Sequence, residues 1–303
     1  MGADLSVTLG RLTLRNPVLI ASGTCGYARE MLGLVDFSQL GGVVPKTVTA
    51  TPRAGNPPPR TVETPSGLLN AIGLDNDGID HFIAHHLPYL RTLPTSIIPN
   101  VAGETEDDFV ELAAMIGREP GLAALELNLS CPNVAGGTDF ATDPARTCRI
   151  VRRCRDACPL PLIAKLTPNV TDIVAIAQAA ADGGADAVSL ANTVLGIAID
   201  WRKKRSILGN GTGGLSGPAI KPIVLRMVWQ VAKARVLPIV AVGGIATLDD
   251  AMEFMVAGAT AIQIGTANFY DPKASTRIVE QLPAALEAIG CASSREAVGV
   301  MHR

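Results

Sequence analysis

Leu125-Glu126-Leu127-Asn128-Leu129-Ser130-Cys131-Pro132-Asn133 runs from an apolar strand into a polar turn that carries a thiol. The leucines alternate with polar residues at the period of a strand, and the proline ends the strand because it has no backbone donor. The thiol is the side chain of this stretch that can exchange a proton near neutral pH. The stretch therefore predicts an active-site strand end, and a buried structural cysteine between two turn-forming asparagines is the alternative.

Apolar runs of strand length recur along the chain, and segments of helical character follow them. Each run ends in glycine or in a polar group, and helices are expected over 30–40 and 78–91. Repeated β-then-α units predict a closed parallel (β/α)8 barrel, the TIM-barrel fold, with an amino-terminal β-hairpin over 5–14. We expect residues 1–303 to form a single domain, a usual length for such a barrel. The eight runs cover residues 17–21, 42–45, 96–103, 125–129, 161–165, 187–193, 238–242 and 261–264.

Insertions interrupt the repeat after the second, fourth and sixth strands, and we expect them to act as lids. The first one carries His81, His85 and His86 on its helix. The i, i+4 pair is formally capable of binding a metal, but a solvated helix face is the preferred interpretation and no metal site is predicted. The basic run 202–205 is interpreted as a solvated loop.

Composition narrows the class of protein. The formal charge of −2 gives no footprint for nucleic acid, and no apolar run is long enough to predict a membrane span. The six cysteines show no metal-binding or disulfide spacing, so we expect reduced thiols and a cytoplasmic location. Cys154 and Cys158 lie four residues apart and are expected to pack in the core.

The carboxyl ends of the predicted strands gather functional groups at one face of the barrel. Barrel active sites form at this face, and glycines after strands seven and eight suit a phosphate. An isomerase, aldolase or lyase of phosphate esters would fit, but paired carboxylates are missing from the strand ends. Amides and cations around an uncharged cavity favour a flavin instead. The strand-end groups are Ser22, Lys46, Asn100, Asn128, Lys165, Asn192, Gly243-Gly244 and Gly265-Thr266.

Longer motifs carry a resemblance to a known family. They are Asn16-Pro17, Ala21-Ser22-Gly23, the stretches 55–60, 70–74 and 128–133, Lys165 to Asn169, Asn192-Thr193, and 214–218. In this order they cover nearly the whole chain. The chain resembles the class 1 dihydroorotate dehydrogenases, and within them the NAD-linked 1B catalytic subunits.

The resemblance implies a set of site residues. FMN would be bound by Ser22, Lys46, Thr47, Asn100, Asn128, Lys165, Ala191, Gly217, Gly243, Gly244, Gly265 and Thr266. Substrate would be bound by Lys46, Asn70, Ala71, Ile72, Gly73, Leu74, Asn128, Asn133, Asn192 and Thr193. Cys131 matches the catalytic base of the family. Ala191 stands where we would expect a bulkier residue against the flavin.

The resemblance also implies the reaction and the partners. (S)-dihydroorotate would be oxidised to orotate in pyrimidine (UMP) biosynthesis, with Cys131 as general base and flavin N5 as hydride acceptor. The barrel would form a homodimer and bind a subunit carrying FAD and a [2Fe-2S] cluster, giving a heterotetramer that passes electrons to NAD. The alternatives are the fumarate-linked 1A class, a dihydropyrimidine dehydrogenase-like enzyme and, more distantly, a phosphate-ester isomerase or lyase.

Overall fold

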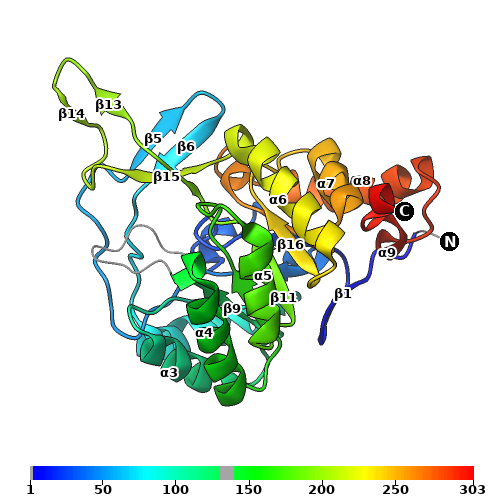
Figure 1. The fold of residues 1–303 in the computed structure, drawn as a ribbon, viewed down its shortest axis with the longest axis horizontal. Helices are drawn as coiled ribbons and strands as arrows, with labels where there is room; N and C mark the ends of the chain where they lie inside the picture. The colour runs from blue at the N-terminus through cyan, green and yellow to red at the C-terminus, as the bar shows by residue number, and fades with distance from the viewer. Residues whose placement is uncertain (1–2, 130–139) are drawn as a thin grey trace.

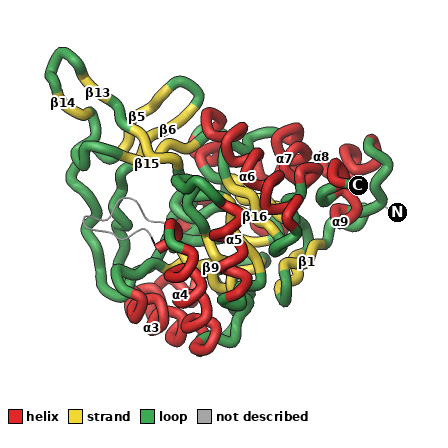
Figure 2. The backbone as a smooth tube through the Cα atoms, viewed as in Figure 1, coloured by secondary structure: helices red, strands yellow, loops and turns green. Residues whose placement is uncertain are grey.

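The computed structural model describes residues 3–129 and 140–303. Strands form an inner cylinder and helices cover its outside (Figures 1 and 2). Near the amino terminus, Asp4 pairs with Ser293 in an isolated parallel bridge, so the two ends of the chain lie together.

The central sheet is parallel and closes on itself. Its order is β7-β4-β3-β17-β16-β11-β10-β9-β8, and β7 and β8 are two halves of one strand separated at Ile98-Pro99. On one side Ile98 N–H donates to Val43 O, and on the other Glu126 N–H donates to Pro99 O. The (β/α)8 barrel is therefore confirmed. Its strands are β3 Val18–Ile20, β4 Gly42–Val43, β7 Ser96–Ile97, β8 Asn100–Val101, β9 Leu125–Asn128, β10 Leu162–Lys165, β11 Ala187–Leu190, β16 Ile239–Val242 and β17 Ala261–Ile264.

A hairpin plugs the amino-terminal end of the barrel, as predicted. Strands β1 Val7–Leu9 and β2 Leu12–Leu14 pair antiparallel, and each buries the apolar residues at both of its ends. These apolar side chains pack against an inward-facing layer of the barrel, which consists of Leu19, Val44, Ile98, Ala124, Ile163, Ala187, Val240 and Ala261. One end of the barrel interior is thus filled with apolar side chains, so a site can open only at the other end.

Six α-helices surround the barrel among the described residues, and local capping fixes where they begin. Thr105 and Thr247 form capping boxes with Asp108 and Asp250, and Asp143 caps the fourth helix ahead of Pro144. The helices are α3 Glu106–Gly117, α4 Pro144–Ala157, α5 Ile173–Asp182, α6 Lys221–Ala234, α7 Leu248–Ala257 and α8 Ala274–Ala288. Shorter elements are η4 Phe140–Thr142, η5 Pro218–Ile220, η6 Thr266–Phe269, α9 Ser294–Ala297 and η7 Val300–His302. Cys154 and Cys158 are buried in the core, as predicted.

The helix expected over 30–40 is wrong. The segment instead forms two 3-10 turns, η1 Arg29–Met31 and η2 Phe37–Gln39. Gly33 lies between them in the left-handed region with φ of +76°. The Asp36 carboxylate then accepts the Ser38 N–H, which begins a new turn instead of continuing a helix. The helix expected over 78–91 exists in three parts, α1 Ile79–His81, a π-helical segment η3 Phe82–His86 and α2 Leu87–Leu90.

The insertions after the second and sixth strands pair with each other. They form one antiparallel sheet of order β12-β15-β6-β5. Its strands are β5 Thr61–Thr64, β6 Gly67–Asn70, β12 Val194–Gly196 and β15 Gly213–Ser216, and an arm of β13 Ile199–Asp200 and β14 Arg205–Ser206 projects beyond it (Figure 1). The action of these insertions as lids stays a prediction. The insertion after the fourth strand falls largely on residues 130–139, outside the described residues.

Candidate functional site

A pocket opens where the barrel strands reach their carboxyl ends. Its wall combines strand ends of the barrel with residues of the antiparallel sheet, so segments far apart in sequence meet there. Most of the predicted site residues line it, namely Ser22, Lys46, Thr47, Asn70, Ile72, Gly73, Leu74, Asn128, Lys165, Ala191, Asn192, Thr193, Gly217, Gly243, Gly244, Gly265 and Thr266. The structure therefore brings together residues that the sequence spreads over 245 positions, from Ser22 to Thr266.

One side of the pocket is built from glycines at the ends of the seventh and eighth strands. Gly244 has φ of +77°, and a Cβ there would lie 2.6 Å from Lys221 Cβ, so the backbone requires glycine. A Cβ at Gly265 would meet nothing closer than Ala21 Cβ at 3.6 Å. The glycine at this second position is thus not required by packing within the chain. It leaves room for a ligand to approach the backbone closely.

The loop 70–74 is held by the proline-rich segment that precedes it. Asn56 donates from its backbone N–H to Ile72 O at 3.0 Å and from Nδ2 to Ala71 O at 3.1 Å. Arg60 anchors the same turn by donating to Asn56 O and by pairing with Asp75 at 2.7 Å. A Cβ at Gly73 would collide with Asn56. The two motifs recognised separately in the sequence are therefore one structural unit.

Amides and a lysine gather where the fourth, fifth and sixth strands end. Asn192 Nδ2 donates to Asn128 Oδ1 at 3.2 Å, and Asn192 Oδ1 accepts the backbone N–H of Thr193 at 2.8 Å. Lys165 is paired in register with Asn128 and is 6% exposed. The peptide bond between Leu190 and Ala191 is cis. These contacts fix the direction of the amide groups before any ligand binds.

Beneath the pocket lies a polar layer that the sequence analysis missed. Its centre is Glu126, which is fully buried. The carboxylate accepts hydrogen bonds from Asn100 Nδ2 at 2.7 Å, Ser189 Oγ at 2.6 Å and Gln263 Nε2 at 2.8 Å, and Lys165 Nζ lies 3.8 Å away. The signal in the sequence was the strand period. Glu126 and Asn128 are two residues apart in one strand, so both must face the barrel interior.

Four predicted site residues are not found on the described pocket wall. Asn100 is fully buried in the polar layer, and Ala71 of the loop 70–74 is also fully buried. Cys131 and Asn133 lie outside the described residues. Several lining residues were in turn not predicted: Thr24, Thr61, Leu68, Ser216, Phe269 and Tyr270. Thr61, Leu68 and Ser216 come from the antiparallel sheet, whose assembly from two distant insertions no local motif reveals.

The electrostatics of the described pocket wall favour an anionic or electron-rich ligand. Its charged side chains are Lys46 and Lys165, and no carboxylate lines the part of the wall that the structure describes. Asn100 Oδ1 is buried without a hydrogen-bond partner among the described residues, so it can accept a donor from a ligand or a water molecule. Close backbone approach at the glycines, two cations and the amides of Asn128 and Asn192 fit a phosphorylated flavin such as FMN.

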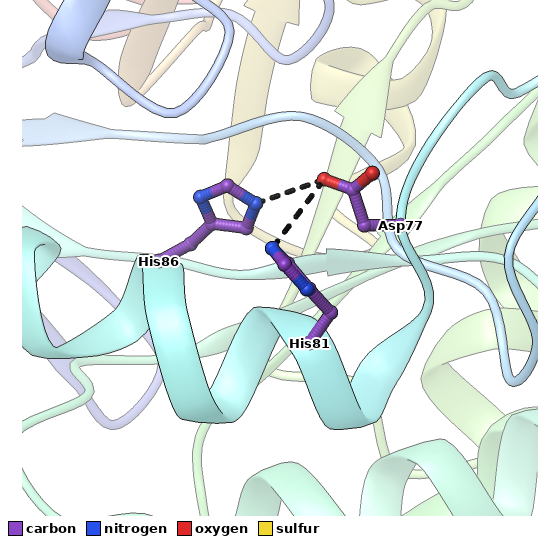
Figure 3. Close-up of side chains that lie close together, drawn as sticks. All are labelled: Asp77, His81 and His86. Atoms are coloured by element: carbon purple, nitrogen blue, oxygen red, sulfur yellow. Dashed lines mark hydrogen bonds and ion pairs between the residues drawn. The ribbon is translucent and has the colours of Figure 1, made fainter.

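The expected i, i+4 histidines of the first insertion, His81 and His85, lie side by side with ring centroids 4.3 Å apart, and His86 joins them. The π-helical segment brings His81 and His86 onto one face beside Asp77, with His86 Nε2 3.0 Å and His81 Nε2 4.0 Å from the carboxylate (Figure 3). The three groups offer ligand atoms within 4.8 Å of one another. Asp77 and His81 are exposed, and the imidazole of His86 stacks on Tyr27. The hydrogen bond from His86 already accounts for the arrangement, and the solvated helix face stays our interpretation.

Comparison with known proteins gives consistent matches over the chain. The sequence pattern of a family described as "Dihydroorotate dehydrogenase" matches residues 4–286. A protein of Geotalea uraniireducens (strain Rf4) is 52% identical over 299 residues, which is 98% of each chain, and one of Pelobacter propionicus is 51% identical over 303 residues, the whole of each. A protein of Geobacter sulfurreducens is 52% identical over 300 residues. All three are named "Dihydroorotate dehydrogenase B (NAD(+)), catalytic subunit".

Proposed function

Because the chain belongs to the dihydroorotate dehydrogenase family of oxidoreductases, we propose that it oxidises (S)-dihydroorotate to orotate with bound FMN, within one domain spanning 1–303. The observation that carries the proposal is the pocket wall. It joins the family's motifs at the carboxyl ends of the barrel strands and presents lysines and amides, without carboxylates on its described part. The reaction belongs to pyrimidine biosynthesis, and the cytoplasmic location expected from the sequence stays a prediction.

Distinct parts of the wall would hold distinct parts of the cofactor. We assign the phosphate to the glycine side, with Gly217, Gly243, Gly244, Gly265 and Thr266. We assign the ring to the amide and lysine side, where Lys165 would balance negative charge that develops on reduction. Ser22, Lys46, Thr47, Asn100, Asn128 and Ala191 complete the proposed FMN set. When bound, FMN supplies a hydride acceptor at N5.

The substrate would lie against the loop 70–74 and the asparagines. The N–H, C=O and carboxylate groups of its ring match the donors and acceptors of Asn70, Asn128, Asn192 and Thr193, with Lys46 as a cation for the carboxylate. We propose that Cys131 removes the proton from carbon 5 while the hydride leaves carbon 6. Asn133 is proposed as a further substrate contact. The hydrogen bonds of the Asn128–Asn192 pair support this assignment because they hold two amides in a fixed direction.

We propose that electrons then pass to a partner subunit and on to NAD. The relatives' names describe a catalytic subunit and NAD(+), which supports a separate electron-transfer subunit. An FAD- and [2Fe-2S]-carrying partner on a homodimer of this chain, a heterotetramer, is the proposed assembly. The projecting arm and its base expose Leu195, Ile197, Ile199, Trp201 and Ile207, which supports burial of this surface in an assembly. No helix among the described residues is long and apolar enough to cross a membrane.

Acceptor chemistry tests the proposal against its alternatives. Purified alone, the FMN-loaded chain is expected to oxidise dihydroorotate with a dye and to reduce NAD hardly at all until the partner subunit is added. Efficient turnover with fumarate would assign it to the 1A class instead. Turnover of dihydrouracil but not dihydroorotate would indicate the dihydropyrimidine dehydrogenase reaction, and a colourless protein that converts a phosphate ester would refute the flavin assignment.

A further inference from the structure

Glu126 is a fully buried carboxylate at the centre of the barrel, and both of its oxygens accept hydrogen bonds. Three side chains on three other strands donate to it, Asn100 on β8, Ser189 on β11 and Gln263 on β17. Lys165 on β10 adds a cation 3.8 Å from Oε1. Burial of a carboxylate costs free energy unless such partners compensate for lost hydration. A valine or leucine here would avoid that cost, so a stability role alone does not explain the residue.

The charge of the carboxylate dictates how its neighbours are oriented. An ionised carboxylate only accepts hydrogen bonds, so Asn100 and Gln263 must turn their NH2 groups toward it. The carbonyl oxygens of these two amides then point away from the carboxylate. Among the described residues, Asn100 Oδ1 and Gln263 Oε1 are both buried without a hydrogen-bond partner. Glu126 therefore holds two buried acceptor groups that have no hydrogen-bond donor among the described residues.

This polar layer lies directly beneath the pocket. Asn128, two residues after Glu126 on the same strand, lines the wall, and Lys165 beside it does the same. Glu126 itself does not line the wall among the described residues, so it can act only through its neighbours. Lys165 is the member of the layer that reaches both the carboxylate and the pocket.

We propose that Glu126 is a positioning residue for the flavin. Its carboxylate holds the Lys165 ammonium at the pocket floor, offsets part of that positive charge, and turns the Asn100 amide so that its oxygen is presented as an acceptor. The proposal rests on the proposed function, because the bound group is taken to be FMN. Besides Lys165, the negative charge of Glu126 then sets how strongly the site prefers reduced over oxidised flavin.

Replacement of the charge at constant shape tests the proposal. In Glu126→Gln the positive charge of Lys165 loses its counter-charge, so we expect reduced flavin to gain about tenfold in affinity relative to oxidised flavin. For a two-electron couple this is a rise of about 30 mV in the reduction potential. Lys165→Met should shift the potential in the opposite direction. Glu253→Gln is the matched control, because Glu253 also pairs with a lysine, Lys221, but its side chain is 47% exposed and does not line the described pocket wall.

The amide orientation has its own readout in FMN binding. In Glu126→Gln the introduced NH2 group replaces either Oε1, which accepts from Asn100, or Oε2, which accepts from Ser189 and Gln263, so one neighbouring amide must turn over. We expect FMN binding to weaken by about tenfold, a typical cost of one lost hydrogen bond in a buried site. In a double-mutant cycle Asn100→Ala should weaken binding less in the Glu126→Gln background than in the wild type. Additive effects would show that Glu126 does not act through Asn100 and would refute this part.

A second variant keeps the test decisive when Glu126→Gln does not fold. Ser189→Ala removes one donor and leaves the carboxylate charge less compensated, so the potential should move to the negative side. Unchanged potentials in every folded variant of the layer would overturn the inference while wild-type protein still binds FMN. Failure of the wild-type protein to bind FMN at all would refute the proposed function itself, so the two failures are distinguishable.

Discussion

Lys165→Met is the substitution whose consequences can be worked out furthest from the structure. Lys165 and Glu126 form a buried ion pair, with side chains that are 8% and 0% exposed. Removal of one partner of such a pair costs about 3–5 kcal/mol because the other charge is left buried. Glu126 keeps three hydrogen bonds in the variant, so we expect the lower end, about 3 kcal/mol.

Thermal and denaturant unfolding measure this loss. For a chain of this size 1 kcal/mol corresponds to about 2 °C, so the melting temperature should fall by about 6 °C. The control is Lys221→Met, whose ammonium pairs with Asp250 at 2.6 Å but remains partly exposed, and whose loss should cost about 1 kcal/mol. Equal losses in the two variants, or a Lys165→Met protein as stable as the wild type, would refute the reasoning about the buried layer.

Three further predictions concern the proposed general base, the glycine side of the pocket and the ion pair between Asp186 and Arg11. Cys131→Ala should retain FMN but slow flavin reduction by dihydroorotate by about 10²- to 10⁴-fold in stopped flow, and a rate near wild type would remove the thiol from the mechanism. Gly265→Ala should weaken FMN binding with little change in melting temperature, since its Cβ meets no protein atom closer than 3.6 Å. Gly244→Ala, in contrast, should lose about 2–4 kcal/mol of stability. Equal stability of the two variants would contradict the steric argument. Burial raises the pKa of Asp186, but hydrogen bonds from Arg11 and a backbone amide outweigh it and hold that pKa below its usual value. Asp186→Asn should therefore cost about 1–2 kcal/mol near neutral pH. The difference from wild type should shrink as the pH falls from about 4, the usual carboxylate pKa, through the lower pKa of folded Asp186; a difference independent of pH would refute this.

The barrel could be predicted because each strand has a recognisable pattern in its own stretch of sequence. Apolar runs followed by glycine or a polar residue recur eight times, and helix starts at Thr105 and Asp143 carry capping residues that fix their positions. The expected helix over 30–40 failed because Gly33 and Asp36 favour turns more strongly than the apolar spacing favours a helix. Local chemistry therefore decided both the successes and this error.

The parts that could not be predicted depend on contacts between distant segments. The sheet that joins β6 to β15 pairs Leu69 with Leu215, which are 146 positions apart, and neither strand carries a signal for the other. Glu126 was placed in a predicted strand, but its role appears only when three other strands bring donors to it. The π-helical segment likewise adds a neighbour to the expected i, i+4 pair, because it brings His86 beside His81 and Asp77.

Anaerobic titration of the FMN-loaded protein with dihydroorotate tests the central claim most directly. The account predicts that the yellow colour bleaches in proportion to added dihydroorotate, with about one equivalent per flavin, and that orotate appears in the same amount. The two-electron balance of the proposed reaction requires this equality. A flavin that stays bound and oxidised while dihydroorotate is in excess would contradict the account.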